Sequence, residues 1–336
     1  MTDQELQLPW TRPGWFEEAG AWIHAELERQ GLRLSGRIEQ PHVRPWSTVL
    51  YVPTSEGQLY FKATAPALSH EPALTQALSR WRPDCMPQVL ATDRERGWML
   101  MGSAGAMLRS HIHSATDIQH WRQVLPLYAE VQIEMAGRLD ELLALGALDR
   151  RLATLPAQYE QLLADNEALR IDLPDGLSAQ EYRRLRALIP RFAAMCQELA
   201  SSRVPETLHH DDFHDGNVFV RDGRYIFSDW GESCAAHPFF TLTVGLRSIA
   251  WRFELEENAP ELVQLRDTYL EPWLRYESYQ NLVSAARVAQ RLGMVCRALT
   301  WYRVVSNLEE PFKAEHAEAV PGWLQEFLNA QTSASL

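Results

Sequence analysis

Residues 208–231 read LHHDDFHDGNVFVRDGRYIFSDWG, and the interpretation of the whole chain starts from this stretch. Two short apolar segments, residues 218–220 and 225–227, flank the turn sequence Arg221-Asp-Gly-Arg224. Aspartate and glycine favour tight turns, whereas β-branched and aromatic residues favour strands. The stretch therefore predicts a small β-hairpin.

Three oxygen-bearing side chains flank this predicted hairpin. Asp212 and Asn217 precede its first strand, and Asp229 follows its second strand. Mg²⁺ prefers hard oxygen ligands and usually takes one or two from protein, while phosphates and water supply the rest. Phosphoryl transfer needs such a metal, a carboxylate that receives the proton of the acceptor, and a cation on the phosphates. The spacing thus points to phosphate chemistry, and the chain must also supply the cation.

Lysine usage identifies a candidate for that cation. Of the 32 basic residues, only Lys62 and Lys313 are lysines, and Lys62 lies in the apolar stretch Leu59-Tyr-Phe-Lys-Ala63. A strand lysine often only extends its amine to solvent. A compact ammonium, however, suits a phosphate cleft better than the bulkier guanidinium fork of arginine. We therefore interpret Lys62 as a phosphate-binding residue.

The composition excludes several classes of protein. With 336 residues, 46% of them hydrophobic and 23% charged, the chain suits one two-lobed domain or two domains, and not a disordered or disulfide-stapled protein. A net charge of −12 argues against nucleic-acid and anionic-membrane partners. The acidic N-terminus, the lack of a long apolar run and four widely spaced cysteines lead us to expect a cytoplasmic protein with no secretory signal and no membrane span.

The pattern of the sequence changes near residue 101. Residues 1–101 combine short apolar segments of strand type with two helical segments, whereas residues 102–336 are mainly helical around the hairpin. We therefore predict an α+β protein with a small antiparallel β-rich N-terminal lobe (1–101) and a larger, mainly helical C-terminal lobe (102–336). The predicted helices span 14–30, 69–81, 117–145, 157–168, 178–200 and parts of 240–307, and the predicted strands of the first lobe span 48–52, 58–62, 87–91 and 97–101.

The motif His210-x-Asp212-x-x-x-x-Asn217, followed twelve residues later by Asp229-Trp-Gly231, resembles the aminoglycoside phosphotransferase and choline kinase-like family, which shares the protein-kinase fold. The resemblance extends over roughly residues 30–305. It implies a protein-kinase-like two-lobed fold whose N-terminal lobe binds ATP, with GTP as the alternative, together with Mg²⁺. It also implies that Asp212 is the catalytic base, that Asn217 and Asp229 are the magnesium ligands, and that His210 is structural.

Within the first lobe, the resemblance implies a phosphate-binding lysine with its ion-pair partner and two residues that hold the base of the nucleotide. Lys62 resembles the phosphate-binding lysine of the family, and Glu71 resembles its ion-pair partner. The segment 98–105 resembles the hinge, where the backbone of Met99 and Met101 would hold the adenine.

The chain departs at two places from the sequence patterns of the family that it resembles and of the protein kinases. The region 40–48 lacks the glycines of a protein-kinase phosphate loop; the family often has a tight turn with a serine instead, which makes Ser47 the candidate. Many relatives carry an Asp-Pro-x-x-Asp pattern after the metal loop, where this chain has His237 and Thr241. In the family, those two aspartates are expected to brace the helical lobe, so their absence affects the expected bracing and not the expected chemistry.

We therefore predict a phosphotransferase that moves the γ-phosphoryl group of ATP to a hydroxyl of a small molecule. Only eight residues separate Asp229 from Pro238, which leaves no room for the long activation segment of a protein kinase. An acidic run, made up of Glu254, Glu256, Glu257 and Glu261, allows a cationic acceptor.

Two alternative functions stay open from the sequence. One is a catalytically silent nucleotide-binding module, a pseudokinase that regulates a partner. The other is a metal-dependent hydrolase, in which the histidines and aspartates of residues 209–214 would combine with His111 and His113.

Overall fold

The computed structural model describes residues 8–332, which separate into two compact units. The first unit comprises residues 8–106, 219–231 and 307–313, and the second comprises residues 107–218, 232–306 and 314–332. Two segments from later in the chain thus join the N-terminal residues in the first unit. One of them, residues 219–231, carries most of the predicted hairpin and Asp229.

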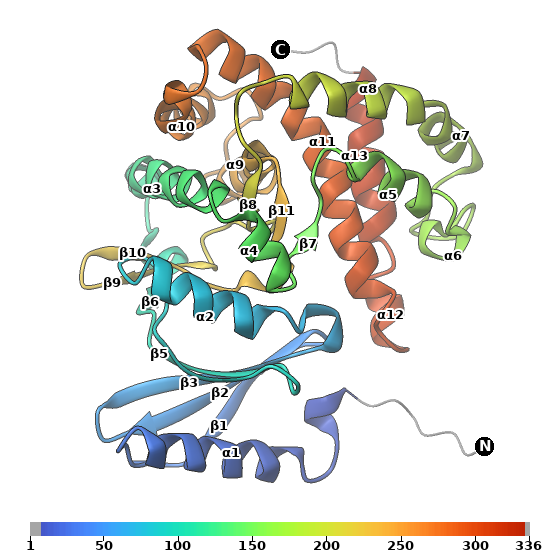
Figure 1. Ribbon diagram of the computed structural model, residues 1–336. Helices are drawn as coiled ribbons and strands as arrows, with labels where there is room; N and C mark the ends of the chain where they lie inside the picture. The colour runs from blue at the N-terminus through green and yellow to red at the C-terminus, as the bar shows by residue number, and fades with distance from the viewer. Residues whose placement is uncertain (1–7, 333–336) are drawn as a thin grey trace, which may run out of the picture. The chain divides into compact units, whose positions relative to one another are not determined.

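An antiparallel sheet of five strands, in the order β1-β2-β3-β5-β4, forms the body of the first unit (Figure 1). Helix α1 (Trp15–Arg29) covers one face of this sheet, and helix α2 (Glu71–Trp81) covers the other. The strands are β1 (Glu39–Val43), β2 (Ser47–Thr54), β3 (Gly57–Thr64), β4 (Val89–Asp93) and β5 (Trp98–Gly102).

The alternation of side chains along β3 assigns its residues to the two faces. Phe61 and Ala63 are buried in the apolar cluster between α1 and the sheet. Because successive side chains of a strand point to opposite faces, Lys62 points to the other face, which α2 covers. The same strand therefore supplies both the core and the candidate phosphate-binding lysine.

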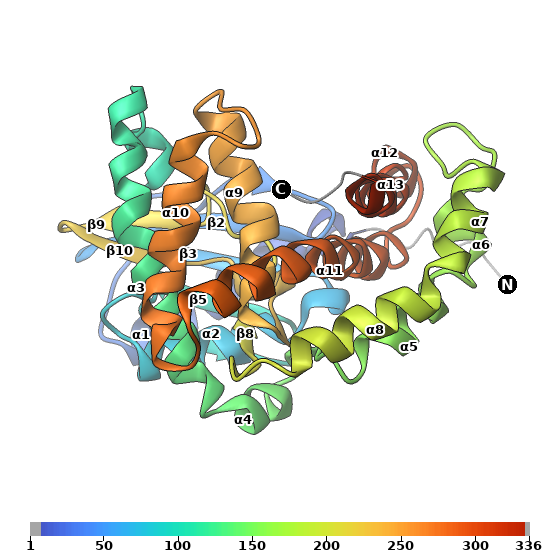
Figure 2. The ribbon, with the colours of Figure 1, turned by 90° about the horizontal axis from the view of Figure 1, so that it is seen from above.

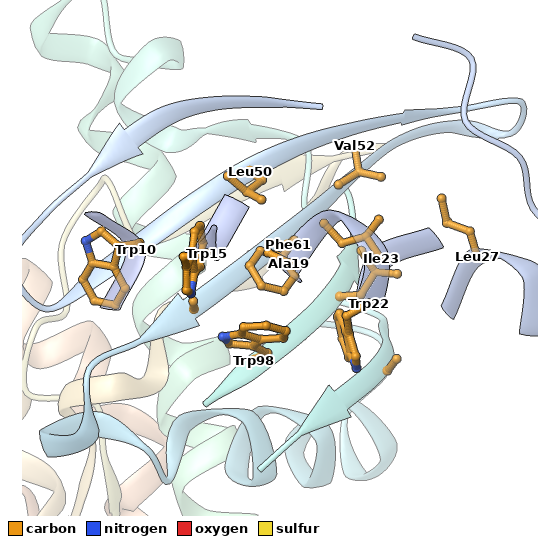
Figure 3. Close-up of a cluster of buried hydrophobic side chains, with 13 residues drawn as sticks. Trp10, Trp15, Ala19, Trp22, Ile23, Leu27, Leu50, Val52, Phe61 and Trp98 are labelled. Atoms are coloured by element: carbon orange, nitrogen blue, oxygen red, sulfur yellow. The ribbon is translucent and has the colours of Figure 1, made fainter. Parts of the chain in front are cut away.

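Aromatic rings fill the space between α1 and the sheet (Figure 3). The ring centroid of Phe61 lies 5.4 Å from that of Trp98 and 5.6 Å from that of Trp22, both in edge-on geometry. Trp15 is 6.1 Å from Phe61. Such pairs contribute stability beyond the area they bury. The helical spacing of Trp15, Trp22 and their apolar neighbours thus explains why residues 15–29 form a helix on this sheet.

The hairpin predicted from residues 218–227 is present as β9 (Val218–Arg221) and β10 (Arg224–Phe227), and β6 (Ala106–Met107) pairs with β9. A side chain at Gly105, whose φ is +94°, would collide with the backbone of Val220, so the close approach of these segments requires glycine. The backbone N–H of Phe227 donates to the carbonyl of Cys85 at 2.8 Å. This bond fixes the end of β10 two residues before Asp229.

Helices make up most of the second unit (Figure 2). The 27-residue helix α11 (Tyr279–Val305) runs through it and contacts α8, α9 and α13. The other helices are α3 (Gln119–Ala136), α4 (Leu139–Ala144), α5 (Leu155–Leu162), α6 (Asn166–Leu169), α7 (Ala179–Ala187), α8 (Ile189–Ala200), α9 (Thr241–Arg252), α10 (Pro260–Leu270) and α13 (Ala319–Thr332), while α12 (Phe312–Glu315) spans the boundary of the units.

A small three-stranded sheet, in the order β7-β11-β8, holds the loop that carries Asp212. Its strands are β7 (Leu148–Asp149), β8 (Thr207–His209) and β11 (Cys234–Ala236). The loop at residues 210–217 begins where β8 ends, and β11 pairs with β8 in antiparallel register. The candidate catalytic residue therefore follows directly on a buried strand.

Neutral hydrogen bonds brace the helical unit at His237 and Thr241, the two positions where the resemblance led us to expect acidic residues. The imidazole Nδ1 of His237 accepts the backbone N–H of Phe239, which caps a short 3₁₀ helix. Thr241 Oγ1 lies 3.3 Å from the amide Nε2 of Gln132 and 3.1 Å from His209 Nδ1. Tyr269 donates its hydroxyl to Gln132 Oε1 at 2.6 Å. This network shows which groups brace the unit in the absence of those acids.

The fold class expected from the sequence is confirmed: an antiparallel sheet at the N-terminus is followed by a mainly helical part. The expected helix 178–200 is broken at residue 188, since Pro190 lacks the N–H that a continuous helix needs. Strand β1 was not predicted, because four of its five side chains are exposed and show no alternation of burial. Within residues 8–332, no helix has the length and hydropathy that a membrane span requires.

We expect the aromatic cluster to be a main source of stability in the first unit. Phe61→Ala should lower the free energy of unfolding by about 3–5 kcal/mol, because it removes a ring packed against three tryptophans. Phe16→Ala, on the same helix as Trp15 but 38% exposed, should change it by less than about 0.5 kcal/mol. Urea denaturation measures both, and equal losses would contradict this account of the core.

The stability of the protein should depend on pH through His237. Burial, with a contribution from His209, lowers the pKa of His237 to about 3, whereas an unfolded histidine has a pKa near 6.5. Below that value the unfolded chain binds a proton that the native state does not bind, so stability falls as pH decreases. This one group should cost about 2 kcal/mol of stability between pH 8 and pH 5.

The variant His237→Asn keeps a side-chain acceptor for the 3₁₀ cap and removes the titrating group. Its free energy of unfolding should therefore vary less between pH 8 and pH 5 than that of the wild type, as measured by urea denaturation at each pH. Identical pH dependence in the two proteins would contradict the assignment to His237.

Candidate functional site

Lys62 forms the centre of a buried ion cluster in the first unit. The residue is 6% exposed, and its ammonium Nζ lies 2.6 Å from Glu71 Oε1 and 2.6 Å from Asp229 Oδ1. Glu71 is the first residue of α2, and Asp229 follows β10. A strand, a helix and the end of a hairpin thus bring one cation and two carboxylates together.

The two carboxylates differ in their access to solvent. The Glu71 side chain is fully buried, and its carboxylate lies so close to Gly231 that a Cβ there would be 3.0 Å from Oε2. The Asp229 side chain is 53% exposed, and its backbone has a φ of +69°. Glu71 is therefore placed to hold Lys62 from within, whereas Asp229 remains accessible to a ligand.

The electrostatics of this cluster follow from burial and charge. Burial alone would lower the pKa of Lys62, but the carboxylates of Asp229 and Glu71 outweigh it and raise that pKa well above its usual range. Burial raises the pKa of Glu71 to about 7, although the charge of Lys62 opposes this shift. The lysine therefore remains an ammonium at neutral pH.

The other predicted nucleotide-binding residues lie in the same sheet. Met99 pairs with Lys62, and Met101 pairs with Tyr60, in the register of β5 against β3. Ser47 begins β2 opposite Thr64 and is 5% exposed. The contact of Ser47 with a phosphate stays a prediction.

In the second unit, Asp212 and Asn217 are joined by hydrogen bonds. The amide Nδ2 of Asn217 donates to the backbone carbonyl of Asp212 at 2.9 Å and to its carboxylate Oδ2 at 3.1 Å. His214 Nε2 lies 3.2 Å from the same Oδ2. Because its Nδ2 bonds to Asp212, the amide of Asn217 has a fixed orientation, and its oxygen is the atom available to a cation.

Aromatic packing and one strained residue hold this loop in place. The hydroxyl of Tyr128 accepts the backbone N–H of His210 at 3.0 Å, and the ring of Phe213 stacks on Tyr128 at a centroid distance of 4.2 Å. Asp211, between His210 and Asp212, has a φ of +61°, a conformation that few residues other than glycine adopt. The loop is thus fixed on both sides of Asp212.

Sequence reasoning missed the strongest partner of Asp212. Arg297, on α11, donates from Nη2 to Asp212 Oδ1 at 2.9 Å, and its Nη1 pairs with Glu232. Burial opposes ionisation of Asp212, but the charge of Arg297 and the contact with His214 hold its pKa well below the usual range. Arg297 lies 85 positions from Asp212 in the chain, and no spacing rule connects them.

A second network joins the same loop to α9. Asp215 Oδ2 accepts from Arg252 Nε at 2.7 Å, and Asp215 Oδ1 lies 3.1 Å from Arg109 Nη2. Arg252 also lines an open hollow of about 480 Å³ at the end of α9, with Trp251 and Glu254 among its other lining residues. Trp251 is 76% exposed. The hollow therefore presents an aromatic face and a carboxylate.

The residues proposed for a metal hydrolase do not gather into one site. Among residues 8–332, one group of three histidine, cysteine or acidic side chains has ligand atoms within 4.8 Å of one another: His209, Asp211 and Cys296. All three are buried, and His209 Nε2 already bonds to Asp211 at 3.0 Å. His111 and His113 are not members of this group.

Known structures resemble the whole fold. A choline/ethanolamine kinase family protein from Mesorhizobium loti is 15% identical, with 95% of each chain covered and a TM-score of 0.61. A macrolide 2′-phosphotransferase from Brachybacterium faecium is 16% identical, with 89% of this chain and 97% of that chain covered and a TM-score of 0.57. The aminoglycoside phosphotransferase APH(4)-Ia is 13% identical, with 94% of this chain and 100% of that chain covered and a TM-score of 0.54.

These structural likenesses establish the fold. A comparison with curated proteins gave no match. The family assignment comes from the sequence itself. The sequence model of the Phosphotransferase enzyme family matches residues 56–279, which include Lys62, Glu71, Asp212, Asn217 and Asp229. The chain therefore belongs to the Phosphotransferase enzyme family.

Proposed function

We propose that this phosphotransferase uses ATP and Mg²⁺ to phosphorylate a hydroxyl group of a small molecule. The observation that carries the proposal is the ammonium of Lys62, buried 2.6 Å from each of two carboxylates, Glu71 and Asp229. A buried charge is costly unless it is paired, and Glu71 already pairs with Lys62. The second carboxylate, Asp229, is 53% exposed, so we propose that it serves the binding of the phosphates and their metal ion. Family membership supports the same chemistry at a coarser level.

In the first unit, Lys62 binds the phosphates of the nucleotide, and Glu71 keeps its ammonium in place. The resemblance of the segment 98–105 to the hinge of the family makes the backbone at Met99 and Met101 the proposed contact for adenine; β5 pairs there with β3 on one side and with β4 on the other. Family membership does not distinguish ATP from GTP, and the assay below includes both.

Asn217 and Asp229 are the residues proposed to hold a magnesium ion. Both residues offer hard oxygens, the preferred ligands of Mg²⁺, and the hydrogen bond from Asn217 Nδ2 to Asp212 leaves the amide oxygen for the cation. When bound, the ion neutralises charge on the transferring phosphoryl group. Asn217 directly precedes β9, and Asp229 follows β10, so the two proposed ligands flank the hairpin in sequence.

Asp212 is the proposed catalytic residue. Its carboxylate accepts the hydrogen bond of the acceptor hydroxyl and orients the oxygen toward the γ-phosphorus. It takes the proton as the oxygen–phosphorus bond forms and the bond from the γ-phosphorus to the β-phosphate oxygen breaks, which releases ADP. Its contacts with Asn217, His214 and Arg297 fix its orientation before the acceptor binds. Most of the rate enhancement then comes from positioning and charge neutralisation.

We propose that the acceptor binds beside α9 and that a cation is favoured there. The exposed ring of Trp251 and the carboxylate of Glu254 line the hollow, and the carboxylate attracts a cationic group. The guanidinium of Arg252 lies 5.4 Å from the centroid of the Trp251 ring, a geometry that shows the ring can face a cation. Arg252 lines the same hollow, and its guanidinium pairs with Asp215, which also pairs with Arg109. We also infer a cytoplasmic location, since four buried free cysteines suit a reducing compartment.

An acceptor screen tests the proposed function. Purified protein is incubated with Mg²⁺ and either ATP or GTP against aminoglycosides, amino alcohols, neutral sugars and amino acids, and phosphorylated products are detected by ³¹P NMR. The proposal expects at least one phosphorylated alcohol, with cationic acceptors preferred. Binding of Mg²⁺ and nucleotide without transfer to any acceptor would favour the pseudokinase alternative.

The variant Asp212→Asn tests the catalytic residue. Asparagine keeps the shape but cannot take a proton, so kcat should fall by about 100-fold to 10,000-fold. The KM for the nucleotide should change by no more than about threefold, since Lys62 binds the phosphates. Steady-state kinetics with the acceptor from the screen measure both constants.

Asp222→Asn is the matched control for this experiment. Asp222 is an exposed aspartate in the turn of the same hairpin, with a φ of +52° that asparagine also adopts. This variant should keep wild-type kinetics. Near-normal kcat in Asp212→Asn would exclude Asp212 as the group that takes the proton.

A further inference from the structure

Arg297 is an arginine buried among carboxylates, and the fold alone does not explain it. Its side chain is 6% exposed, in the middle of the helix α11. Nη2 donates to Asp212 Oδ1 at 2.9 Å, and Nη1 pairs with Glu232. One guanidinium therefore bridges the proposed catalytic residue and a second acid.

The planar guanidinium suits this bridging role. Its fixed fork presents donors to two carboxylates at once, which the single ammonium of lysine does less well. The Cζ of Arg297 lies 5.4 Å from the centroid of the Trp301 ring, one helical turn further along α11. The fork is thus held by Glu232 at one end and by an aromatic ring nearby, with its other end directed at Asp212.

A further carboxylate, that of Asp211, lies near the same guanidinium. The backbone of Asp211 has a φ of +61°, and its carboxylate Oδ2 lies 3.9 Å from Arg297 Nη1. This further negative charge helps to keep Arg297 in the buried position from which it reaches Asp212.

The two oxygens of Asp212 then have separate tasks. Oδ2 accepts from Asn217 Nδ2 at 3.1 Å and faces His214 Nε2 at 3.2 Å, whereas Oδ1 is bonded to Arg297. Contacts on both oxygens prevent rotation of the carboxylate about its Cβ–Cγ bond. The direction from which an acceptor hydroxyl approaches is therefore set before it binds.

We propose that Arg297 is a positioning residue that fixes the carboxylate of Asp212 for the acceptor hydroxyl, and that Glu232 holds Arg297 in that place. The inference rests on the proposed function of Asp212. It goes beyond that function because neither Arg297 nor Glu232 touches the reacting atoms in the mechanism, and both act through another residue.

Kinetics of three variants test the proposal. Arg297→Lys keeps the charge but not the fork, Arg297→Met removes both, and Glu232→Gln weakens the hold on the arginine. A misplaced catalytic group costs rate and not substrate binding. We expect kcat to fall about 10-fold in Arg297→Lys and Glu232→Gln and about 100-fold in Arg297→Met, with both KM values within about threefold of the wild type.

Arg150→Lys is the matched control. Arg150 is partly buried and donates to the backbone of α11 at Leu299, 3.2 Å away, and no contact joins it to the loop of Asp212 among the described residues. It should lower the melting temperature without changing kcat per folded molecule. If Arg297→Lys behaves like this control, with lower stability and normal kcat per folded molecule, the arginine is structural and the proposal fails.

A crystal structure of Arg297→Lys provides a readout that does not depend on catalysis. The proposal expects the carboxylate of Asp212 to turn away from its wild-type orientation, and an unchanged carboxylate would overturn it. If the wild type phosphorylates no acceptor, the proposed function fails, but this orientation still decides whether Arg297 positions Asp212. Should Arg297→Met not fold, Arg297→Lys and Glu232→Gln carry the kinetic test.

Discussion

The need to neutralise one buried ammonium shapes the first unit. Lys62 lies on a strand whose neighbouring residues form the aromatic core, and so its amine cannot remain charged without carboxylates close by. Glu71 enters from the first turn of α2, and Asp229 enters from the end of β10. The sheet, the helix and the hairpin thus each contribute one member of this buried ion cluster.

The second unit applies the same principle with the charges reversed. Here the central groups are carboxylates, and Arg297 together with hydrogen-bond donors from the loop neutralises and orients them. Burial raises the pKa of Glu232 to about 7, although Arg297 opposes the shift, while Asp212 is held ionised. Asp212 is therefore the more acidic of the two groups beside Arg297, and it stays a carboxylate at neutral pH.

Much of this could be predicted from the sequence, because its signals are local. The spacing from Asp212 to Asn217 and Asp229 lies within one hairpin and its flanks, and the helical periodicity of residues 14–30 needs no tertiary information. The contacts of Arg297 could not be predicted, since they join α11 to a loop 85 positions away. The bracing by Thr241 and Gln132 was missed for the same reason, because neutral hydrogen-bond networks leave no spacing pattern.

Labelling of lysine by an acyl-phosphate derivative of ATP tests the central claim, that Lys62 binds nucleotide phosphates. Such a probe transfers its acyl group to an amine beside the bound phosphates, and mass spectrometry need distinguish only two lysines, Lys62 and Lys313. The account predicts acylation of Lys62 that excess ATP with Mg²⁺ prevents, and no protected labelling of Lys313. Acylation of Lys313 alone, or labelling of Lys62 that ATP with Mg²⁺ does not reduce, would contradict it.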